Sequence, residues 1–254
     1  MLPEETPILC LAVGALTEDY VTKLESMLRR NFPRKFRLIC ITDRPRPLPS
    51  SIQTIDASQW PGPRPGMRPT TYKLFLYDRQ RVPIPEFLYL DTSMVIRADM
   101  SPLIQFADAQ AQDLITVRDW NYDAYNTSVM RIRQTDRLAE IPKAYEAGET
   151  FVQRVPGDQD FVTGLVRTRG FEDNVTTFPD ELVACFGAAR KASRRGSGKG
   201  QEMLEQAVVV KFNGRPKMHE LIDPRYRLRQ ILETRNPLHR RAWFWVKETK
   251  DLWK

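Results

Sequence analysis

The sequence predicts an α/β protein with a mixed, mostly parallel central sheet flanked by helices. Short apolar runs of strand-favouring residues alternate with segments of helical periodicity, which is the order of a parallel α/β sheet. Residues 87–90 (FLYL) form the clearest run and suit a strand buried on both faces. The run stops at Asp91, and a carboxylate at the carboxyl end of a buried strand lies where open α/β sheets bind their ligands.

The first 55 residues predict a β-α-β-β unit. Strands are expected at 8–13, 36–42 and 52–55, and a helix is expected to start at Thr17. Apolar residues of this helix recur at helical spacing: Tyr20, Val21, Leu24, Met27 and Leu28. A helix between the first two strands favours their parallel pairing, because parallel neighbours need a long crossover connection.

Residues 60–66 (WPGPRPG) are too rich in proline and glycine for regular structure. They could be a domain linker or a loop over a cleft. The loop is favoured because the sheet pattern resumes soon afterwards and needs the earlier strands as neighbours. A helix is then predicted over 70–81, followed by the strand at 87–90 and a second short strand at 94–96. Asp91 would therefore lie at the floor of a cleft.

The second half of the chain continues the alternation. A short amphipathic turn is expected at 102–104. Further strands are predicted at 113–117, 125–132, 175–178 and 207–212. Helices are predicted at 137–147 and 161–166, the second with acidic residues in its first turn.

Two basic segments complete the chain. Residues 187–200 (GAARKASRRGSGKG) are expected to be a mobile loop, either a solvated insertion or a basic lid that orders over a phosphate. Residues 1–223 are expected to form one domain, and 224–254 a basic and aromatic helical tail. The tail either enters the headgroup region of an anionic membrane or packs its tryptophans onto the domain. Its basic and aromatic residues are Arg240, Arg241, Trp243, Phe244, Trp245, Lys247, Lys250, Trp253 and Lys254.

Composition narrows the class of protein. A chain of 254 residues with a net charge of +7 favours anionic partners, which include nucleic acid, phosphorylated small molecules and anionic membranes. No recognised nucleic-acid motif is present, so no nucleic-acid partner is expected. The three cysteines form no CxxC pair, which fits a reducing compartment. We find no signal peptide and no apolar run of about 20 residues, so the expected location is the cytoplasm, with peripheral contact at the inner membrane face as the alternative.

Five short motifs carry the functional prediction. Taken singly each is weak, since an aspartate that ends a strand is usually a turn former and Asp158 before a helix is usually a cap. Their order and spacing along the chain carry more information than any one of them. They are Lys73-Leu74-Phe75-Leu76, Tyr89-Leu90-Asp91-Thr92-Ser93, Tyr125-Asn126-Thr127-Ser128-Val129-Met130, Gly157-Asp158-Gln159-Asp160-Phe161 and Val210-Lys211-Phe212-Asn213-Gly214-Arg215-Pro216-Lys217.

In this order the motifs resemble those of the GT-A glycosyltransferases of family 8, which include glycogenin-like and bacterial galactosyltransferase-like enzymes. The resemblance extends over residues 8–220. It implies a GT-A, Rossmann-like fold and transfer of a sugar from a nucleotide sugar, a UDP-sugar in this family, to a glycan or lipid-linked acceptor with retention of configuration.

The resemblance also implies which residues form the site. Asn126, Asp158 and Gln159 would contact the donor sugar and the reaction centre, with Gln159 as a polar stabiliser rather than a base. Gly14, Tyr20 and Asp43 would lie near the base and ribose. The full set expected to bind the nucleotide sugar is Val13, Gly14, Tyr20, Asp43, Lys73, Leu90, Asp91, Thr92, Ser93, Asn213, Gly214 and Lys217.

Two positions depart from the family pattern, and both concern its metal site. The family's Asp-x-Asp is Asp91-Thr92-Ser93 here, and Asn213 replaces a histidine. The family implies Mn²⁺ or Mg²⁺, with Asp91 as the ligand that remains, but hard divalent cations prefer several carboxylate oxygens. We therefore expect cations of the chain to substitute partly for the metal, with Lys73, Lys217 and the segment 190–199 as candidates. The alternative function is a catalytically silent GT-A protein that binds a nucleotide or a glycan.

Overall fold

The computed structural model describes residues 2–15, 18–151, 154, 156–193, 198–226, 228 and 245–254, and it divides into two compact units. Unit 1 comprises Met1–Val21, Arg34–Thr92 and Ile104–Phe178, and unit 2 comprises Thr22–Pro33, Ser93–Leu103 and Pro179–Lys254. Each unit is thus assembled from three segments of the chain. The described residues of the predicted tail belong to unit 2.

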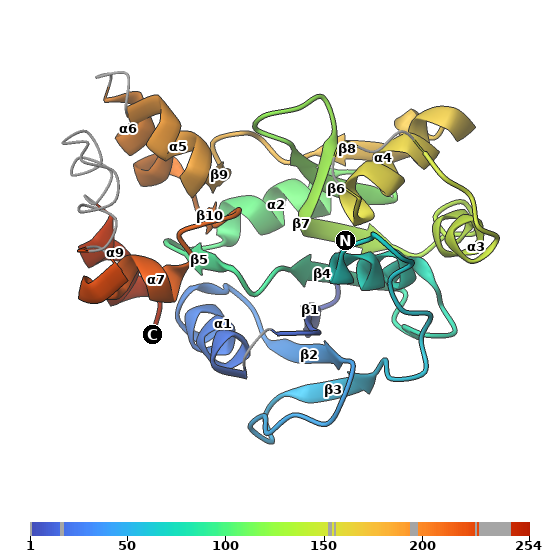
Figure 1. Ribbon diagram of the computed structural model, residues 1–254, viewed down its shortest axis with the longest axis horizontal. Helices are drawn as coiled ribbons and strands as arrows, with labels where there is room; N and C mark the ends of the chain where they lie inside the picture. The colour runs from blue at the N-terminus through green and yellow to red at the C-terminus, as the bar shows by residue number, and fades with distance from the viewer. Residues whose placement is uncertain are drawn as a thin grey trace. The chain divides into compact units, whose positions relative to one another are not determined.

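Unit 1 contains a seven-stranded sheet in the order β3-β2-β1-β4-β7-β6-β8 (Figure 1). Its strands are β1 Thr6–Ala12, β2 Phe36–Thr42, β3 Gln53–Asp56, β4 Glu86–Leu90, β6 Leu114–Arg118, β7 Tyr125–Arg133 and β8 Val175–Thr177. β1 pairs in parallel with β2 and with β4. The pairs β2–β3 and β6–β8 are also parallel. Only β7 is antiparallel to its neighbours β4 and β6. The predicted mixed, mostly parallel sheet is confirmed.

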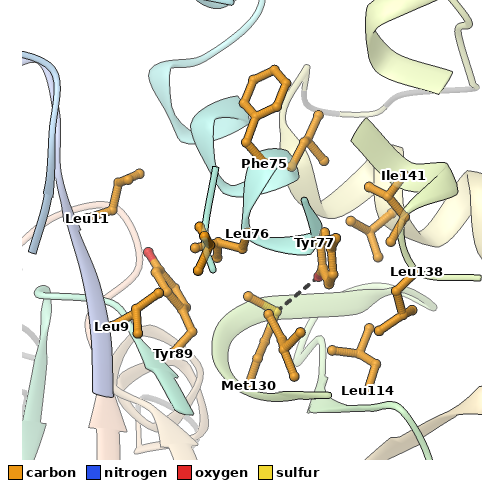
Figure 2. Packing of buried hydrophobic residues seen from close by; sticks show 14 of the residues in the cluster. Leu9, Leu11, Phe75, Leu76, Tyr77, Tyr89, Leu114, Met130, Leu138 and Ile141 are labelled. Atoms are coloured by element: carbon orange, nitrogen blue, oxygen red, sulfur yellow. Dashed lines mark hydrogen bonds between the residues drawn. The ribbon is translucent and has the colours of Figure 1, made fainter. Parts of the chain in front are cut away.

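The apolar runs seen in the sequence are the buried strands of this sheet. All seven residues of β1 are buried, and Phe87 to Leu90 of β4 are fully shielded from solvent. Tyr77 and Met130 belong to the core that packs against the sheet, and the Tyr77 hydroxyl donates to Met130 Sδ at 3.3 Å (Figure 2). Burying a side chain of this size contributes about 1.5–3 kcal/mol, so the core stabilises the sheet.

Three helical elements of unit 1 carry or surround the sequence motifs: η1 Pro69–Tyr77, α3 Glu140–Glu146 and α4 Asp158–Arg169. α3 and α4 both pack against η1, and α4 also packs against β7. Phe75, Leu76 and Ile141, labelled in Figure 2, belong to the core that these elements share. The first residue of α4, Asp158, is thereby held beside η1 and β7. The remaining helices that begin in unit 1 or contribute to it are α1 Glu18–Asn31, α2 Ser101–Ala109 and η2 Glu172–Asn174.

Unit 2 contains a three-stranded sheet in the order β5-β10-β9. The strands are β5 Met94–Ile96, β9 Val183–Cys185 and β10 Val209–Lys211. β10 is antiparallel to β5 and parallel to β9. Among the described residues, the helices that lie wholly in this unit are α5 Phe186–Ser193, α6 Lys199–Gln206, α7 Met218–Ile222 and α9 Val246–Leu252.

Three predicted elements were wrong in type. The helix expected over 70–81 is a 3₁₀ helix that ends at Tyr77; it has Pro69 in its first turn, followed by two β-branched threonines of low helix propensity. The turn expected at 102–104 is part of the longer helix α2, whose apolar residues Leu103, Ile104 and Ala107 are buried at helical spacing.

The basic loop expected at 187–200 instead contributes to α5 and α6, and residues 194–197 lie outside the described part. Gly200 explains the difference, because a Cβ there would lie 2.1 Å from the carbonyl oxygen of Ala189. This glycine therefore serves the close approach of α6 to α5 and not the flexibility of a loop.

The described part of the tail packs onto unit 2. Trp245 and Trp253 are each 2% exposed. The Nζ of Lys23 lies 3.7 Å from the centre of the Trp253 ring, and Arg30 donates to the Leu252 carbonyl at 2.6 Å. These two tryptophans therefore pack onto the protein, as the second of the two predictions for the tail expected. Trp243, Phe244, Arg240 and Arg241 lie outside the described residues, as does Thr17 at the expected start of α1.

None of the described helices is long and apolar enough to cross a bilayer.

Candidate functional site

An ammonium shared by two carboxylates forms the centre of the candidate site in unit 1. Lys73 Nζ lies 2.8 Å from Asp91 Oδ1 and 3.5 Å from Asp158 Oδ2. It also donates to the carbonyl oxygen of Thr127 at 3.2 Å, and the Thr127 hydroxyl donates to Asp158 Oδ2. Four of the five sequence motifs, separated by up to 85 residues, therefore supply one polar cluster.

The cluster is largely buried, and the two carboxylates keep the ammonium of Lys73 charged. Lys73 is 5% exposed and Asp158 is also 5% exposed. Burial opposes the charge on Lys73, but the carboxylates of Asp158 and Asp91 outweigh this effect and raise the pKa of the lysine. Burial, reinforced by the Asp91 carboxylate, raises the pKa of Tyr89 well above its usual value, so its hydroxyl remains a donor to Asp91 Oδ1 at 2.8 Å.

A second network joins the side-chain amides of Asn126 and Gln159 through one carboxylate. Asp119 Oδ2 accepts from Asn126 Nδ2 at 3.0 Å and from Gln159 Nε2 at 2.7 Å. Asn126 Nδ2 also donates to Gln159 Oε1 at 3.2 Å. The network orients both amides, so that the three residues expected at the reaction centre, Asn126, Asp158 and Gln159, are brought together at the start of β7 and of α4.

Asp43 organises a third polar group, at the ends of β1 and β2. Its Oδ2 accepts from the backbone N–H of Gly14 at 2.9 Å, and its Oδ1 accepts from Arg46 at 3.0 Å. Partial burial opposes ionisation, but the Gly14 hydrogen bond and the Arg46 guanidinium lower the pKa of Asp43. Gly14 has a φ of +62°, a conformation that glycine adopts without strain.

Four further residues predicted to bind the donor are largely buried in unit 1. Leu90 is fully buried, and the exposed fractions are 2% for Thr92, 5% for Val13 and 6% for Tyr20. Their side chains serve packing, so any contact with a ligand would come from their backbone or from a small exposed edge.

Unit 2 supplies the remaining predicted residues together with one that was not predicted. Lys211 Nζ donates to Ser93 Oγ at 2.6 Å, and Lys217 Nζ donates to the carbonyl oxygen of Phe212 at 3.1 Å. Asn213 and Gly214 follow β10; Asn213 is half-buried and Gly214 is exposed.

The donor atoms do not suit Mn²⁺ or Mg²⁺. Within the part of the chain that the structure describes, no group of three or more His, Cys, Asp or Glu side chains could hold a metal ion. Asp91 Oδ1 accepts from two donors, Lys73 and Tyr89. Ser93 offers a hydroxyl that accepts from an ammonium. Hard cations need several free anionic oxygens, and these residues do not offer them.

Sequence reasoning missed two functional candidates. Asp119 follows β6 and resembles an ordinary turn aspartate, although its position directly after a buried strand is the signal that identified Asp91. Lys211 ends the apolar run of β10 and reads as a solvated charge. Only the strand pairing, which sets Lys211 opposite Met94, brings its ammonium to Ser93.

No family model and no curated protein sequence matches the chain. Several solved structures match the chain in fold. Glycosyltransferase GlyE of Streptococcus pneumoniae TIGR4 has a TM-score of 0.61 at 14% identity, with 97% of this chain and 64% of that chain covered. Galactosyltransferase LgtC, solved with donor and acceptor sugar analogues, has a TM-score of 0.54 at 14% identity, with 97% of this chain and 96% of that chain covered. The bifunctional glycosyltransferase WbbM has a TM-score of 0.58 at 10% identity, with 98% of this chain and 52% of that chain covered.

The chain thus spans less than two thirds of GlyE and nearly the whole of LgtC. Both comparisons cover 97% of this chain. At these identities the likeness concerns the fold. The chain therefore has the GT-A fold that these glycosyltransferases share.

Proposed function

We propose that the protein transfers a sugar from a nucleotide sugar, a UDP-sugar, to a glycan or lipid-linked acceptor with retention of configuration. The observation that carries the proposal is the pair of networks in unit 1. One joins Lys73 to Asp91 and Asp158, and the other joins Asn126 to Gln159. Both lie at strand ends and at a helix start in a GT-A fold, where open α/β sheets take their ligands.

In the proposed reaction, the bond between the anomeric carbon and the diphosphate oxygen breaks, and its electron pair leaves with the diphosphate. The acceptor oxygen forms a bond to the same face of that carbon. The acceptor's proton passes to the departing diphosphate oxygen. Charge develops on the leaving group and on the sugar, so fixed dipoles and cations aimed at these positions lower the barrier.

The amides of the second network suit the developing positive charge on the sugar. Gln159 Nε2 is held by Asp119, which leaves Gln159 Oε1 to accept from Asn126 or from a sugar hydroxyl. A side-chain amide does not titrate, so Gln159 acts as a polar stabiliser at any pH in the working range. Asp158, fixed by Thr127 and Lys73, would accept from the donor sugar's hydroxyls.

The direct test is titration of the protein with UDP, GDP and ADP by calorimetry, followed by a thermal-shift screen of nucleotide sugars. We expect UDP to bind with a dissociation constant in the micromolar range, corresponding to about 7–8 kcal/mol, and one UDP-sugar to raise the melting temperature more than UDP does. Binding of none of the three nucleotides would refute the donor-site assignment.

A second function is favoured by one observation, the replacement of two family metal positions by Ser93 and Asn213. A catalytically silent GT-A protein would bind the nucleotide or a glycan without turnover. Sugar-nucleotide hydrolysis distinguishes the two functions, because a silent protein binds UDP-sugar and releases no UDP.

A further inference from the structure

Tyr122 is an exposed aromatic residue of unit 1. It lies in the loop between β6 and β7, three residues after Asp119. The residue is 51% exposed, and within the described part of the chain only Leu228 is a second large hydrophobic residue with comparable exposure. Single exposed hydrophobic residues are common on protein surfaces, so the surroundings of Tyr122 decide what its ring can bind.

An arginine stacks on the Tyr122 ring and is itself held by α4. The guanidinium carbon of Arg154 lies 4.3 Å from the centre of the ring. Arg154 Nη2 donates to Asp160 Oδ1 at 2.6 Å, and the backbone N–H of Arg154 donates to Asp160 Oδ2 at 2.7 Å. Asp160 is only 5% exposed. The guanidinium therefore has a fixed position over one face of the ring, and about half of the tyrosine surface remains open to solvent.

Local contacts also fix the two chain segments that carry this pair. In the β6–β7 loop, the backbone N–H of Asp119 donates to the carbonyl oxygen of Ala124 at 2.9 Å, and the N–H of Ala124 donates to the carbonyl oxygen of Tyr122 at 3.0 Å. Phe151 lies so close to Gly164 of α4 that a Cβ at Gly164 would be 2.5 Å from the Cβ of Phe151. Gly164 thus lets Phe151 anchor the chain on α4, three residues before the arginine.

The same two segments carry residues of the reaction centre. Asp119 accepts from Gln159 Nε2 at 2.7 Å. Asp160, which holds Arg154, directly follows Gln159 in α4. Three residues of extended chain span at most about 11 Å, so the Cα of Tyr122 lies within this distance of the Cα of Asp119. This separation is comparable with the length of a disaccharide, so the second sugar of an acceptor bound at Gln159 can reach the tyrosine.

We propose that Tyr122 and Arg154 form an acceptor subsite for the sugar ring next to the one that receives the donor sugar, so that the acceptor is an oligosaccharide. The inference rests on the proposed transferase function. The face of an aromatic ring carries partial negative charge and attracts polarised C–H bonds, which line the apolar face of a pyranose. The N–H donors of a guanidinium suit the hydroxyl or carboxylate oxygens at the edge of such a ring. A tyrosine side chain is ordered at little entropic cost.

A glycan array followed by ligand-observed NMR titration of full-length protein saturated with UDP tests the proposal. The array identifies the oligosaccharide that wild type binds most tightly, and the titration compares it with the methyl glycoside of its terminal sugar. Tyr122→Ala is expected to weaken the oligosaccharide at least about tenfold, as the loss of a central aromatic contact does. The methyl glycoside, and UDP measured by calorimetry, should stay within about threefold of wild type.

Two variants control this experiment. Tyr122→Phe keeps the aromatic ring, so it should bind the oligosaccharide within about threefold of wild type. Asn121→Ala changes an exposed residue of the same loop and should bind all three ligands as wild type does. Because Tyr122 is exposed, Tyr122→Ala should also leave the melting temperature unchanged.

The results separate the subsite from the function on which it rests. If wild type releases UDP from a UDP-sugar but binds no glycan of the array, or if Tyr122→Ala binds the oligosaccharide as wild type does, the subsite is wrong and the transferase function stands. Equal weakening of the oligosaccharide and the methyl glycoside, or of the oligosaccharide and UDP, would also contradict the subsite. If wild type neither binds UDP nor releases it from any UDP-sugar, the transferase function fails, and the acceptor role of Tyr122 fails with it.

Discussion

Replacing Lys73 with methionine is expected to lower the stability of the protein by about 3 kcal/mol, because it leaves two carboxylates in a buried cluster without their shared cation. Asp91 and Asp158 have 17% and 6% of their side-chain surface exposed, so water replaces little of the lost interaction. For a chain of this length the melting temperature should fall by about 10 °C. UDP release from the donor should fall by about a hundredfold or more.

Two variants control this experiment. Lys143→Met removes an exposed lysine of α3 in the same unit and should leave the melting temperature and the rate of UDP release unchanged. Lys73→Met combined with Asp158→Asn removes one of the two carboxylate charges that lose their cation. The double variant should recover about half of the lost stability, because the two residues are in contact and their effects are coupled. Equal melting temperatures for wild type and Lys73→Met would show that the cluster contributes nothing to folding.

The pH dependence of the Lys73 contribution follows from the direction of its pKa shift. The folded state raises the pKa of Lys73 above its ordinary value of 10.5. The stabilisation is therefore fully present below pH 10.5 and is lost as the pH rises through the raised folded-state pKa. The difference between wild type and Lys73→Met should be constant from pH 6 to 9 and should shrink as the pH rises through the raised folded-state pKa of Lys73.

Replacing Asp119 with asparagine should disable the amide network and leave the fold intact. Asp119 Oδ1 accepts from the backbone N–H of Asn121 at 2.9 Å, and asparagine preserves this turn. An NH₂ group at the place of Oδ2 cannot accept from Gln159 or Asn126. Losing two hydrogen bonds to a charged acceptor should reduce UDP release from the donor by about 10- to 100-fold.

The binding of UDP alone identifies the cause of that loss. A residue that positions Gln159 at the sugar should leave the dissociation constant of UDP within about threefold. Asn121→Ala, an exposed residue of the same loop, is the matched control. Parallel losses of UDP affinity and of turnover in Asp119→Asn would contradict a role confined to the reaction centre.

Much of unit 1 could be predicted from the sequence because buried strands give a strong local signal. The runs that became β1, β2 and β4 are apolar on both faces, and each ends at the residue where the polar site begins. The motifs at Lys73, Asp91, Asn126 and Asp158 meet as expected, because β4 and β7 are neighbours and α4 packs on β7.

The remaining features depend on contacts between distant parts of the chain. The antiparallel direction of β7 is not encoded in its own composition. The hydrogen bond between Lys211 and Ser93 spans 118 positions and exists only through the β5–β10 register. In the 187–200 segment, glycine and serine suggested a loop, whereas Gly200 permits the close contact of α6 with Ala189 on α5. Tertiary packing decided each of these features.

The most direct test of the proposed function is UDP release from a panel of UDP-sugars, measured with wild-type protein in EDTA and compared with Lys73→Met. We predict that wild type releases UDP from at least one sugar nucleotide, slowly with water as the acceptor, and that Lys73→Met releases it at least about a hundredfold more slowly. UDP binding without release from any UDP-sugar, with or without added glycan, would contradict glycosyl transfer and identify a silent nucleotide-binding protein.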